Sequence, residues 1–493
     1  MIADPPDLPD LMARRAELSP DAIAFEDYAS KRTLSYAQLD RRAGQAAAVM
    51  AVRGVGEGDR VSILCRNRIA FFEILFGCAK LGAILVPLNW RMPAAELGAL
   101  IADAEPLLLF HGVEDAGKVD AIPAIGLDED YEALIAAATP AQGRRQWPAD
   151  GIWYLLYTSG TTGRPKGVIY TFRMALANHV NIGTAIGIRA SDTHANFLPL
   201  FHTGGINLHT LPTLFAGGRV IMLDGFDPDA LVSLIEERRL DTFFAVPAVY
   251  QALLDHPRFA AAPLGHVRHW GCGGATLPDV VAGRYRDLGV RVCNGMGMTE
   301  TGPTAFLADP ADAWDRIGSV GKPQLLCSAR IVDAEGRDVA QGAVGELLFA
   351  GPGVTPGYWR NPEATRAAFT ADGWLRSGDL ARRDADGFYH VAGRRKEMFI
   401  SGGENVYPAE VENVLSACPG VAEAAVVAVP DARWGEIGRA FILPSRGASP
   451  SPDQLGAYCR DRLAAYKVPS SFELVADFPR TAAGKIQKHL LGI

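Results

Sequence analysis

Between about residues 60 and 295, short apolar runs typical of strands alternate with segments in which apolar residues recur at helical spacing. Short β-branched or aliphatic runs predict buried strands at 61–64, 152–157, 219–223, 242–246 and 290–293. Between them, segments such as 227–239 and 278–287 carry apolar residues at helical spacing. Strands that alternate with helices predict a parallel sheet with helices on its faces, so we expect an α/β fold with doubly wound sheets.

The composition changes after about residue 310. Gly and Pro become frequent, and short strands such as 345–350 follow at turn-rich intervals, which predicts a β-rich subdomain. Beyond Gly393 the pattern predicts a compact α+β unit, with strands at 398–400 and 424–429 and helices after Pro408 and at 453–463. We place the boundary at the polar run that begins at Gly393, giving a large domain over 1–392, a hinge over 393–396 and a small mobile domain over 397–493.

The overall composition indicates a folded protein whose main partner is not nucleic acid. The 493 residues are 48% hydrophobic and 21% charged, and a chain of this length is expected to form two or more packed units. Lys and Arg number 48 against 56 Asp and Glu, a formal charge of -8. The basic residues are scattered along the chain, which argues against a nucleic-acid interface.

The cysteines and the N-terminus favour a cytoplasmic location. The seven cysteines include no C-x-x-C pair and mostly have apolar neighbours, so we expect buried free thiols rather than disulfides or a zinc site. The first residues are acidic and proline-rich, without the basic start and apolar run of a signal peptide. No run approaches the ~20 apolar residues that a membrane span requires.

One glycine-rich segment has the composition of a phosphate-binding loop. Its residues are Tyr157, Thr158, Ser159, Gly160, Thr161, Thr162, Gly163, Arg164, Pro165, Lys166 and Gly167. The glycines let backbone N–H groups turn toward an anion, the hydroxyls add donors, and Lys166 adds a positive charge. The segment follows an apolar strand and precedes a helical stretch, which favours phosphate binding over a mobile surface loop.

Two better-known phosphate motifs are excluded. A Walker loop needs glycine where this chain has Pro165, and its lysine is followed by Ser or Thr rather than by Gly167. A dinucleotide fingerprint needs a third glycine three residues after G-x-G, but Gly297 is followed by Met298, Thr299 and Glu300. The phosphate loop is therefore of another kind.

The loop resembles the phosphate-binding signature of the adenylate-forming superfamily, which contains acyl-CoA synthetases, peptide-synthetase adenylation domains and beetle luciferases. Further motifs of that family follow in the family's order across nearly the whole chain, at 295–300, 377–379, 393–396, 401–405 and 479–485. The resemblance implies a two-domain enzyme that joins a carboxylic acid to a thiol, with ATP, Mg²⁺ and CoA as its co-substrates and cofactors.

The resemblance also implies roles for the residues around the nucleotide. Glu300 is expected to hold Mg²⁺ and Thr299 to hydrogen-bond the α-phosphate, while Asp379 and Arg394 are expected to contact the ribose. Both the acid and ATP are negative, so the site must neutralise charge as the carboxylate attacks the α-phosphate. The adenine is expected to lie against two segments, Gly273, Gly274 and Ala275, and Asn294, Gly295, Met296 and Gly297.

Two half-reactions need two arrangements of the domains. By resemblance, Lys485 reaches the α-phosphate and the substrate carboxylate during adenylation, where it stabilises growing negative charge. The small domain then rotates about a hinge at Lys396, so that a thiol can approach the acyl carbonyl. After rotation, Gly402 and Gly403 are expected to line the pantetheine channel, which larger side chains would narrow.

His202 matches a family position that borders both the acyl pocket and the thiol channel. Gly204 and Gly205 suggest room in that pocket, and Asn207 and His209 supply polar contacts if they face it. Two residues depart from the common pattern. Met296 stands where an aromatic residue often stacks on adenine, and Ala483 replaces a frequent hydroxyl residue beside the catalytic lysine.

The sequence therefore predicts an AMP-forming acyl-CoA synthetase, but it leaves the acid open between a medium-chain fatty acid and an aryl or cinnamic-type acid such as ferulate. The chain ends soon after Lys485 without a carrier domain, which favours free CoA over a tethered thiol. A ligase that loads a separate carrier protein, a luciferase-like oxygenase and a non-catalytic nucleotide-binding relative remain alternatives. A homodimer is possible.

Overall fold

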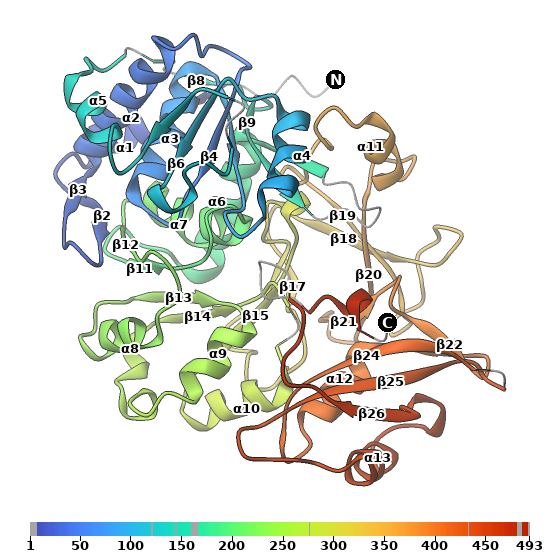
Figure 1. Ribbon diagram of the computed structural model, residues 1–493. Coiled ribbons are helices and arrows are strands. Elements are labelled where there is room, and N and C mark those ends of the chain that lie inside the picture. The colour runs from blue at the N-terminus through green and yellow to red at the C-terminus, as the bar shows by residue number, and fades with distance from the viewer. Residues whose placement is uncertain are drawn as a thin grey trace.

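The computed structural model describes residues 7–119, 122–141, 143–144, 146–158, 166–275, 277–431, 433–480 and 486–491. Four sheets of four or more strands organise the chain in the described part. Figure 1 shows two of these sheets with their helices in the N-terminal half, a third sheet beside them, and an orange-to-red C-terminal unit beside α10. The α/β class and the separate C-terminal unit are thus confirmed.

The first sheet has six strands and is parallel except at one edge. In spatial order they are β10 (Lys166–Thr171), β9 (Ile152–Thr158), β5 (Ile84–Pro87), β4 (Arg60–Leu64), β6 (Leu108–His111) and β7 (Ala124–Gly126). Only the edge strand β10 runs antiparallel to its neighbour. Helices packed in this half include α2 (Tyr36–Ala51), α3 (Ile69–Leu81), α4 (Ala94–Ala104) and α6 (Phe172–Ile186).

A strand that the sequence pattern did not predict, β10, lies between the phosphate loop and the helix that follows it. Thr158 at the end of β9 pairs with Lys166 at the start of β10, which makes residues 159–165 the connection of an antiparallel hairpin. Helix α6 begins only at Phe172, where the Thr171 side chain accepts a hydrogen bond from the Met174 N–H. The β-branched and aromatic residues just before Thr171 favour a strand, so the sequence did contain a signal for β10.

The second sheet has nine strands, of which six central ones are parallel. In spatial order they are β17 (Lys322–Pro323), β16 (Phe306–Leu307), β15 (Val292–Met296), β14 (His269–Cys272), β13 (Thr242–Ala245), β11 (Thr193–Asn196), β12 (Arg219–Met222), β2 (Ile23–Asp27) and β3 (Thr33–Ser35). Its helices include α7 (Thr210–Ala216), α8 (Pro228–Glu236), α9 (Pro247–Leu254) and α10 (Asp279–Asp287). The predicted strands and helices of this region are confirmed, with β15 lying slightly later than predicted.

One apolar core joins the two sheets. It includes Val61 and Tyr154 from the first sheet and Phe25 and Val220 from the second, together with residues of α2, α3, α6 and α7. Because the two layers share this core, the carboxyl ends of their strands are held in a fixed relation. The cysteines are free, and all are buried except the half-buried Cys327.

Two smaller sheets complete the chain. The predicted β-rich subdomain is an antiparallel sheet of β18 (Ser328–Val332), β19 (Gly345–Ala350), β20 (Leu375–Arg383) and β21 (Tyr389–Arg394). The C-terminal unit contains β22 (Phe399–Ser401), β23 (Glu404–Val406), β24 (Val421–Asp431), β25 (Gly435–Pro444) and β26 (Ser471–Leu474), with helices α12 (Pro408–Ser416) and α13 (Pro452–Arg460).

The C-terminal unit touches the large domain through α12. The Asn413 side chain donates to Asp279 Oδ2 at 2.9 Å, and its Oδ1 accepts from the Asp279 backbone N–H at 3.3 Å. Lys396, the predicted hinge, is exposed in the turn between β21 and β22. None of the described helices is both long and apolar enough to span a membrane.

Candidate active site

A buried carboxylate lies near the phosphate-loop hairpin. Glu300 sits on a single 3-10 turn (Thr299–Thr301) and is only 7% exposed. Its Oε1 accepts a hydrogen bond from the Tyr358 hydroxyl at 3.0 Å. Burial raises the pKa of Glu300, although this hydrogen bond and the charges of Arg394 and Lys166 oppose the rise. The carboxylate is therefore held where a cation would relieve its desolvation.

Lys166 lies over the ring of the same tyrosine. Its Nζ is 5.1 Å from the centre of the Tyr358 ring, and Thr158 pairs with it across the hairpin. The structure thus brings Lys166, Tyr358 and Glu300 together from three distant parts of the chain. The predicted phosphate ligands Ser159, Gly160, Thr161, Thr162 and Gly163 lie outside the described residues, as does Lys485.

Tyr358 is the site residue that the sequence reasoning missed. Its segment is hydrogen-bonded to β10, since Ile169 N–H donates to Gly357 O at 3.1 Å and Trp359 N–H donates to Gly167 O at 2.7 Å. These bonds fix the tyrosine beside the phosphate hairpin. The local spacing of residues does not predict the position of Tyr358, because the contact joins segments about two hundred residues apart. The only sequence signal was a Gly-Tyr-Trp run in a loop.

The two predicted ribose ligands contact each other. Asp379 on β20 and Arg394 on β21 are register partners, and Arg394 Nε lies 2.9 Å from Asp379 Oδ1. Arg394 Nη1 also donates to Ser377 O at 3.3 Å. Asp379 is buried, whereas the arginine side chain is 46% exposed. The pair therefore presents a buried acceptor and a solvent-facing donor at one place.

The predicted adenine segments lie side by side, one after the end of β14 and the other largely in β15. Cys272 at the end of β14 pairs with Asn294 in β15, so the loop of Gly273, Gly274 and Ala275 lies next to Gly295. A Cβ on Gly273 would lie 3.3 Å from Gly295 O, and one on Gly297 only 1.4 Å from Pro303 O. Glycine is thus required at 297 by close backbone approach, whereas the contact at 273 is tight but not forbidding. Met296 is half-buried against the core of the β-rich subdomain.

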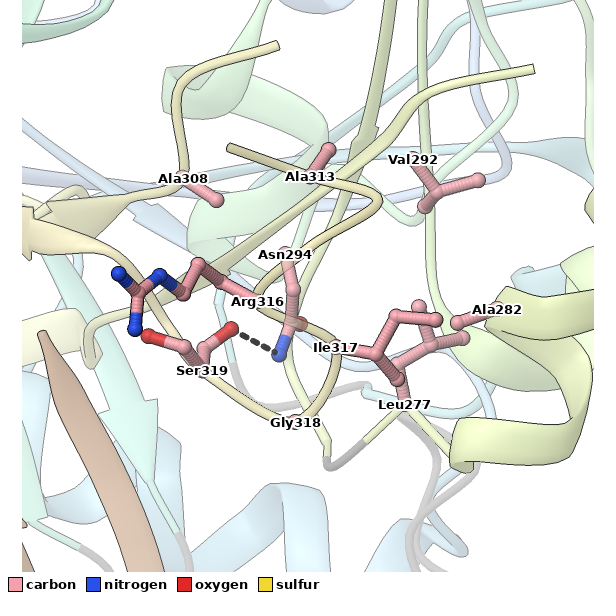
Figure 2. A pocket seen from close by; sticks show the side chains of 10 residues that line it. All are labelled: Leu277, Ala282, Val292, Asn294, Ala308, Ala313, Arg316, Ile317, Gly318 and Ser319. Atoms are coloured by element: carbon pink, nitrogen blue, oxygen red, sulfur yellow. Dashed lines mark hydrogen bonds between the residues drawn. The ribbon is translucent and has the colours of Figure 1, made fainter. Parts of the chain in front are cut away.

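Asn294 lines a small cavity with Leu277, Arg316 and Ser319 (Figure 2). Its Nδ2 donates to Ser319 O at 3.3 Å, the dashed line in that view. Its Oδ1 is buried and meets no hydrogen-bond partner within the described part of the chain. A buried acceptor of this kind is costly unless a ligand or water satisfies it.

The segment around His202 differs in part from its predicted character. His202 is half-buried, and its ring centre lies 4.7 Å from that of Phe201. Gly205 does not provide room, because a Cβ there would meet the carbonyl oxygens of Pro199 and Leu198 at 2.4 and 2.5 Å. A Cβ on Gly204 would make only ordinary contacts with leucine side chains. Asn207 is fully buried, and its Oδ1 accepts from Tyr154 at 2.6 Å.

Gly402 and Gly403 have a local reason to be glycine. They form the turn between β22 and β23 with φ of +61° and +89°, a conformation that side chains disfavour. A Cβ on Gly402 would also lie 2.7 Å from the Trp434 ring. The geometry of this turn is thus enough to explain why both positions are glycine. Their role in a thiol channel stays a prediction.

Comparison with known proteins identifies the family. The family model for the AMP-binding enzyme matches residues 12–359, and the family model for the AMP-binding enzyme C-terminal domain matches residues 410–485. The chain belongs to the AMP-binding enzyme family. It is 42% identical to a feruloyl-CoA synthase from Amycolatopsis sp., over 96% of each chain. An indoleacetate–CoA ligase from Aromatoleum aromaticum is 37% identical, over 98% of this chain and 97% of its own.

A solved structure of the AMP-binding enzyme family also matches over nearly the full length. The ATP-bound form of MatB from Rhodopseudomonas palustris superposes with a TM-score of 0.89 at 33% identity, covering 98% of both chains. The apo form of the same protein gives a TM-score of 0.82. With the CoA ligases named above, these matches make this chain an AMP-forming acid–CoA ligase that uses ATP and CoA.

The described residues fit a nucleotide with one divalent cation. Magnesium prefers oxygen ligands and is often held by one or two carboxylates together with substrate phosphates and water. Glu300 is the buried carboxylate beside the phosphate hairpin. No group of three or more His, Cys, Asp and Glu among the described residues has the geometry to hold a metal, so Glu300 would act as a lone protein ligand.

Proposed function

We propose that this ligase activates an aryl or cinnamic-type acid in two steps. First, a carboxylate oxygen of the acid attacks the α-phosphorus of ATP, the bond to the β-phosphate breaks and pyrophosphate leaves. Then the sulfur of CoA attacks the acyl carbon, the bond to AMP breaks, and the thiol proton is released. The products are the acyl-CoA thioester and AMP.

The observation that best supports this proposal is the contact of Glu300 with the Tyr358 hydroxyl, with Lys166 over the ring of the same tyrosine. A cation held by Glu300 would neutralise phosphate charge, and Lys166 would add a second positive group. Thr299, next to Glu300, would bond the α-phosphate. The relatives named for ferulate and for indoleacetate both act on acids with an aromatic ring, which supports the aryl class over a fatty acid.

The remaining roles follow the same arrangement. Asp379 and Arg394 would hold the ribose, and the bare Oδ1 of Asn294 would accept from the adenine amino group. The higher TM-score to ATP-bound MatB than to its apo form supports an adenylating orientation of the domains. In that orientation Lys485 would act, and rotation at Lys396 would bring Gly402 and Gly403 to the thiol channel beside His202.

Pyrophosphate release tests the proposal. The purified protein is assayed with a panel of cinnamic, hydroxycinnamic, benzoic and medium-chain fatty acids, with and without CoA. Pyrophosphate release with an aryl acid and a CoA-dependent thioester would support it. No release with any acid, a strict need for a carrier protein, or oxygen consumption would refute it.

Lys485→Ala separates the half-reactions. We expect it to abolish pyrophosphate exchange while leaving thioester formation from a supplied acyl adenylate largely intact, because the lysine serves only the first transition state. Equal loss in both steps would contradict this role. Gel filtration and cell fractionation would test the expected homodimer and cytoplasmic location.

A further inference from the structure

Three buried histidines lie close together in the large domain, and of these only His209 has been considered above, as a polar contact for the acyl pocket. His194, His209 and His269 are each at most 5% exposed. The ring centre of His209 lies 4.9 Å from that of His194 and 5.9 Å from that of His269. We call these three residues the histidine cluster. Buried polar side chains nearly always have hydrogen-bond partners, so such a cluster needs an explanation.

The histidine cluster lies on the sheet face that leads to the nucleotide loop. His194, Thr242 and His269 are register partners on β11, β13 and β14, so they share one face. Gly271 and Gly273 follow on the same face of β14 at the next alternate positions. Gly273 begins the predicted adenine loop. The cluster therefore forms the far end of a strip that starts at the nucleotide site.

His209 approaches this strip from a segment outside the sheet. It follows the short helical turn Gly204–Leu208, in the same segment as His202, and directly precedes α7. Its ring centre lies 5.5 Å from that of Phe244. The Phe244 ring in turn covers the two glycines, since Cβ atoms on Gly271 and Gly273 would lie 2.9 and 3.3 Å from it. The Phe244 ring thus lines the strip between the cluster and the nucleotide loop.

Several polar atoms of the cluster have no partner. Within the described part of the chain, His209 Nδ1, both ring nitrogens of His269 and the Thr242 hydroxyl are buried and form no hydrogen bond. Burial lowers the pKa of His194 and His269 to about 4 and that of His209 well below its ordinary value. At neutral pH these rings are uncharged, and each offers one donor and one acceptor nitrogen.

The chemistry of these atoms selects the group that they would bind. An alkyl chain would leave them unsatisfied, at a cost of about 1–3 kcal/mol for each group. A second carboxylate would meet neutral rings rather than a positive charge. A hydroxyl group both donates and accepts, so it matches a bare nitrogen on one ring and an N–H on the other.

We propose that the acyl pocket ends at the histidine cluster and that His209 and His269 hydrogen-bond a ring hydroxyl of the acid. The proposal rests on the proposed function, because it places the acid's carboxyl group at the nucleotide loop. His269 Nε2 lies 3.1 Å from the position of a Cβ on Gly271. Gly271 is roughly 7 Å from Gly273 along the strand, a span comparable with the length of a phenolic acid. The substrate is then a hydroxylated aryl acid that stacks on Phe244.

The ratio of kcat/KM for 4-hydroxycinnamic acid to that for cinnamic acid tests the proposal. A site built to bond a hydroxyl discriminates strongly against the analogue that lacks it, so we expect the wild type to prefer the hydroxylated acid by at least about tenfold in pyrophosphate release. His269→Phe and His209→Phe should bring this ratio close to one by lowering kcat/KM for 4-hydroxycinnamic acid.

His179→Phe is the matched control. His179 is a histidine on α6 that packs edge-on against Phe215, outside the cluster, and burial lowers its pKa too. This variant should keep the wild-type ratio. If the cluster variants fail to fold, Thr242→Val, which removes only the unpartnered hydroxyl at nearly constant volume, must still lower the ratio.

The outcomes separate the two proposals. If no acid releases pyrophosphate, the proposed function fails. If cinnamic and 4-hydroxycinnamic acids react equally in the wild type, the histidine assignment is overturned and the proposed function stands. If octanoic or a dicarboxylic acid is preferred, the proposed aryl class is overturned as well, and only the ligase chemistry stands. An unchanged ratio in folded His269→Phe and His209→Phe would also overturn the histidine assignment.

Discussion

Tyr358→Phe tests whether a single hydroxyl tunes the buried carboxylate of the site. The hydroxyl donates to Glu300 Oε1 at 3.0 Å, and Glu300 is almost fully buried. Hydrogen bonds to charged groups contribute about 1.5–3 kcal/mol. Removing this bond disfavours the ionised form, so it adds to the burial that already raises the pKa of Glu300. At 1.36 kcal/mol per tenfold change, the proton should bind about 10- to 100-fold more tightly.

The assay is the pH profile of kcat/KM for pyrophosphate release. Because only ionised Glu300 would hold the cation, the acidic limb of Tyr358→Phe should move to higher pH, with recovery toward the wild-type rate at alkaline pH. Tyr131→Phe is the matched control, since Tyr131 donates at 2.9 Å to the buried Glu73, where Arg42 also binds. The control should lose stability without moving the limb. Superimposable limbs for all three proteins would refute the reasoning.

Two further predictions concern stability at the site. Burial raises the pKa of Glu300 above its ordinary 4.5, so the folded state holds the proton more tightly and stability falls as pH rises from 4.5 through the raised value. Glu300→Gln should therefore raise the melting temperature at pH 7 by roughly 1–3 °C and give no gain in melting temperature below pH 4.5. It should also abolish pyrophosphate release. A lower melting temperature at pH 7 would contradict this reasoning. Gly297→Ala forces a Cβ to within 1.4 Å of a backbone carbonyl oxygen, so thermal melting should show a loss of more than about 3 kcal/mol. Gly98→Ala on α4, which meets nothing within 4 Å, should melt at or slightly above the wild-type temperature, because Ala favours a helix interior over Gly.

Much of the fold could be predicted because its elements have strong local patterns. The strands near Val61, Thr242 and Gly345 and the helix after Pro408 lie where the apolar periods predicted them. The phosphate hairpin was the exception. Its second strand follows a glycine loop and leads directly into α6, so a short apolar run there fitted either a strand or the start of the helix. Pairing with β9 decided for the strand.

The candidate site divides in the same way. Residue types with a marked chemical role, such as Glu300, Asp379 and Lys166, were found in the sequence because motif order singled them out. Tyr358, His194 and His269 were not, because each depends on contacts between distant segments, whereas His209 was named only as a polar contact for the acyl pocket. Gly205 shows the opposite error, since a glycine assigned to an open pocket proved to be packed against two carbonyl groups.

By itself the sequence determined the class of fold, the order of its units and the motifs of an adenylate-forming enzyme, because hydrophobic period and glycine-rich loops are properties of short segments. Only the tertiary structure decided which side chains meet, as when Tyr358 reaches Glu300 and when His209 comes to lie against two histidines that share one sheet face. The tertiary structure also determines the protonation states, because burial and neighbouring charges, rather than residue identity, set the pKa of a carboxyl group or an imidazole.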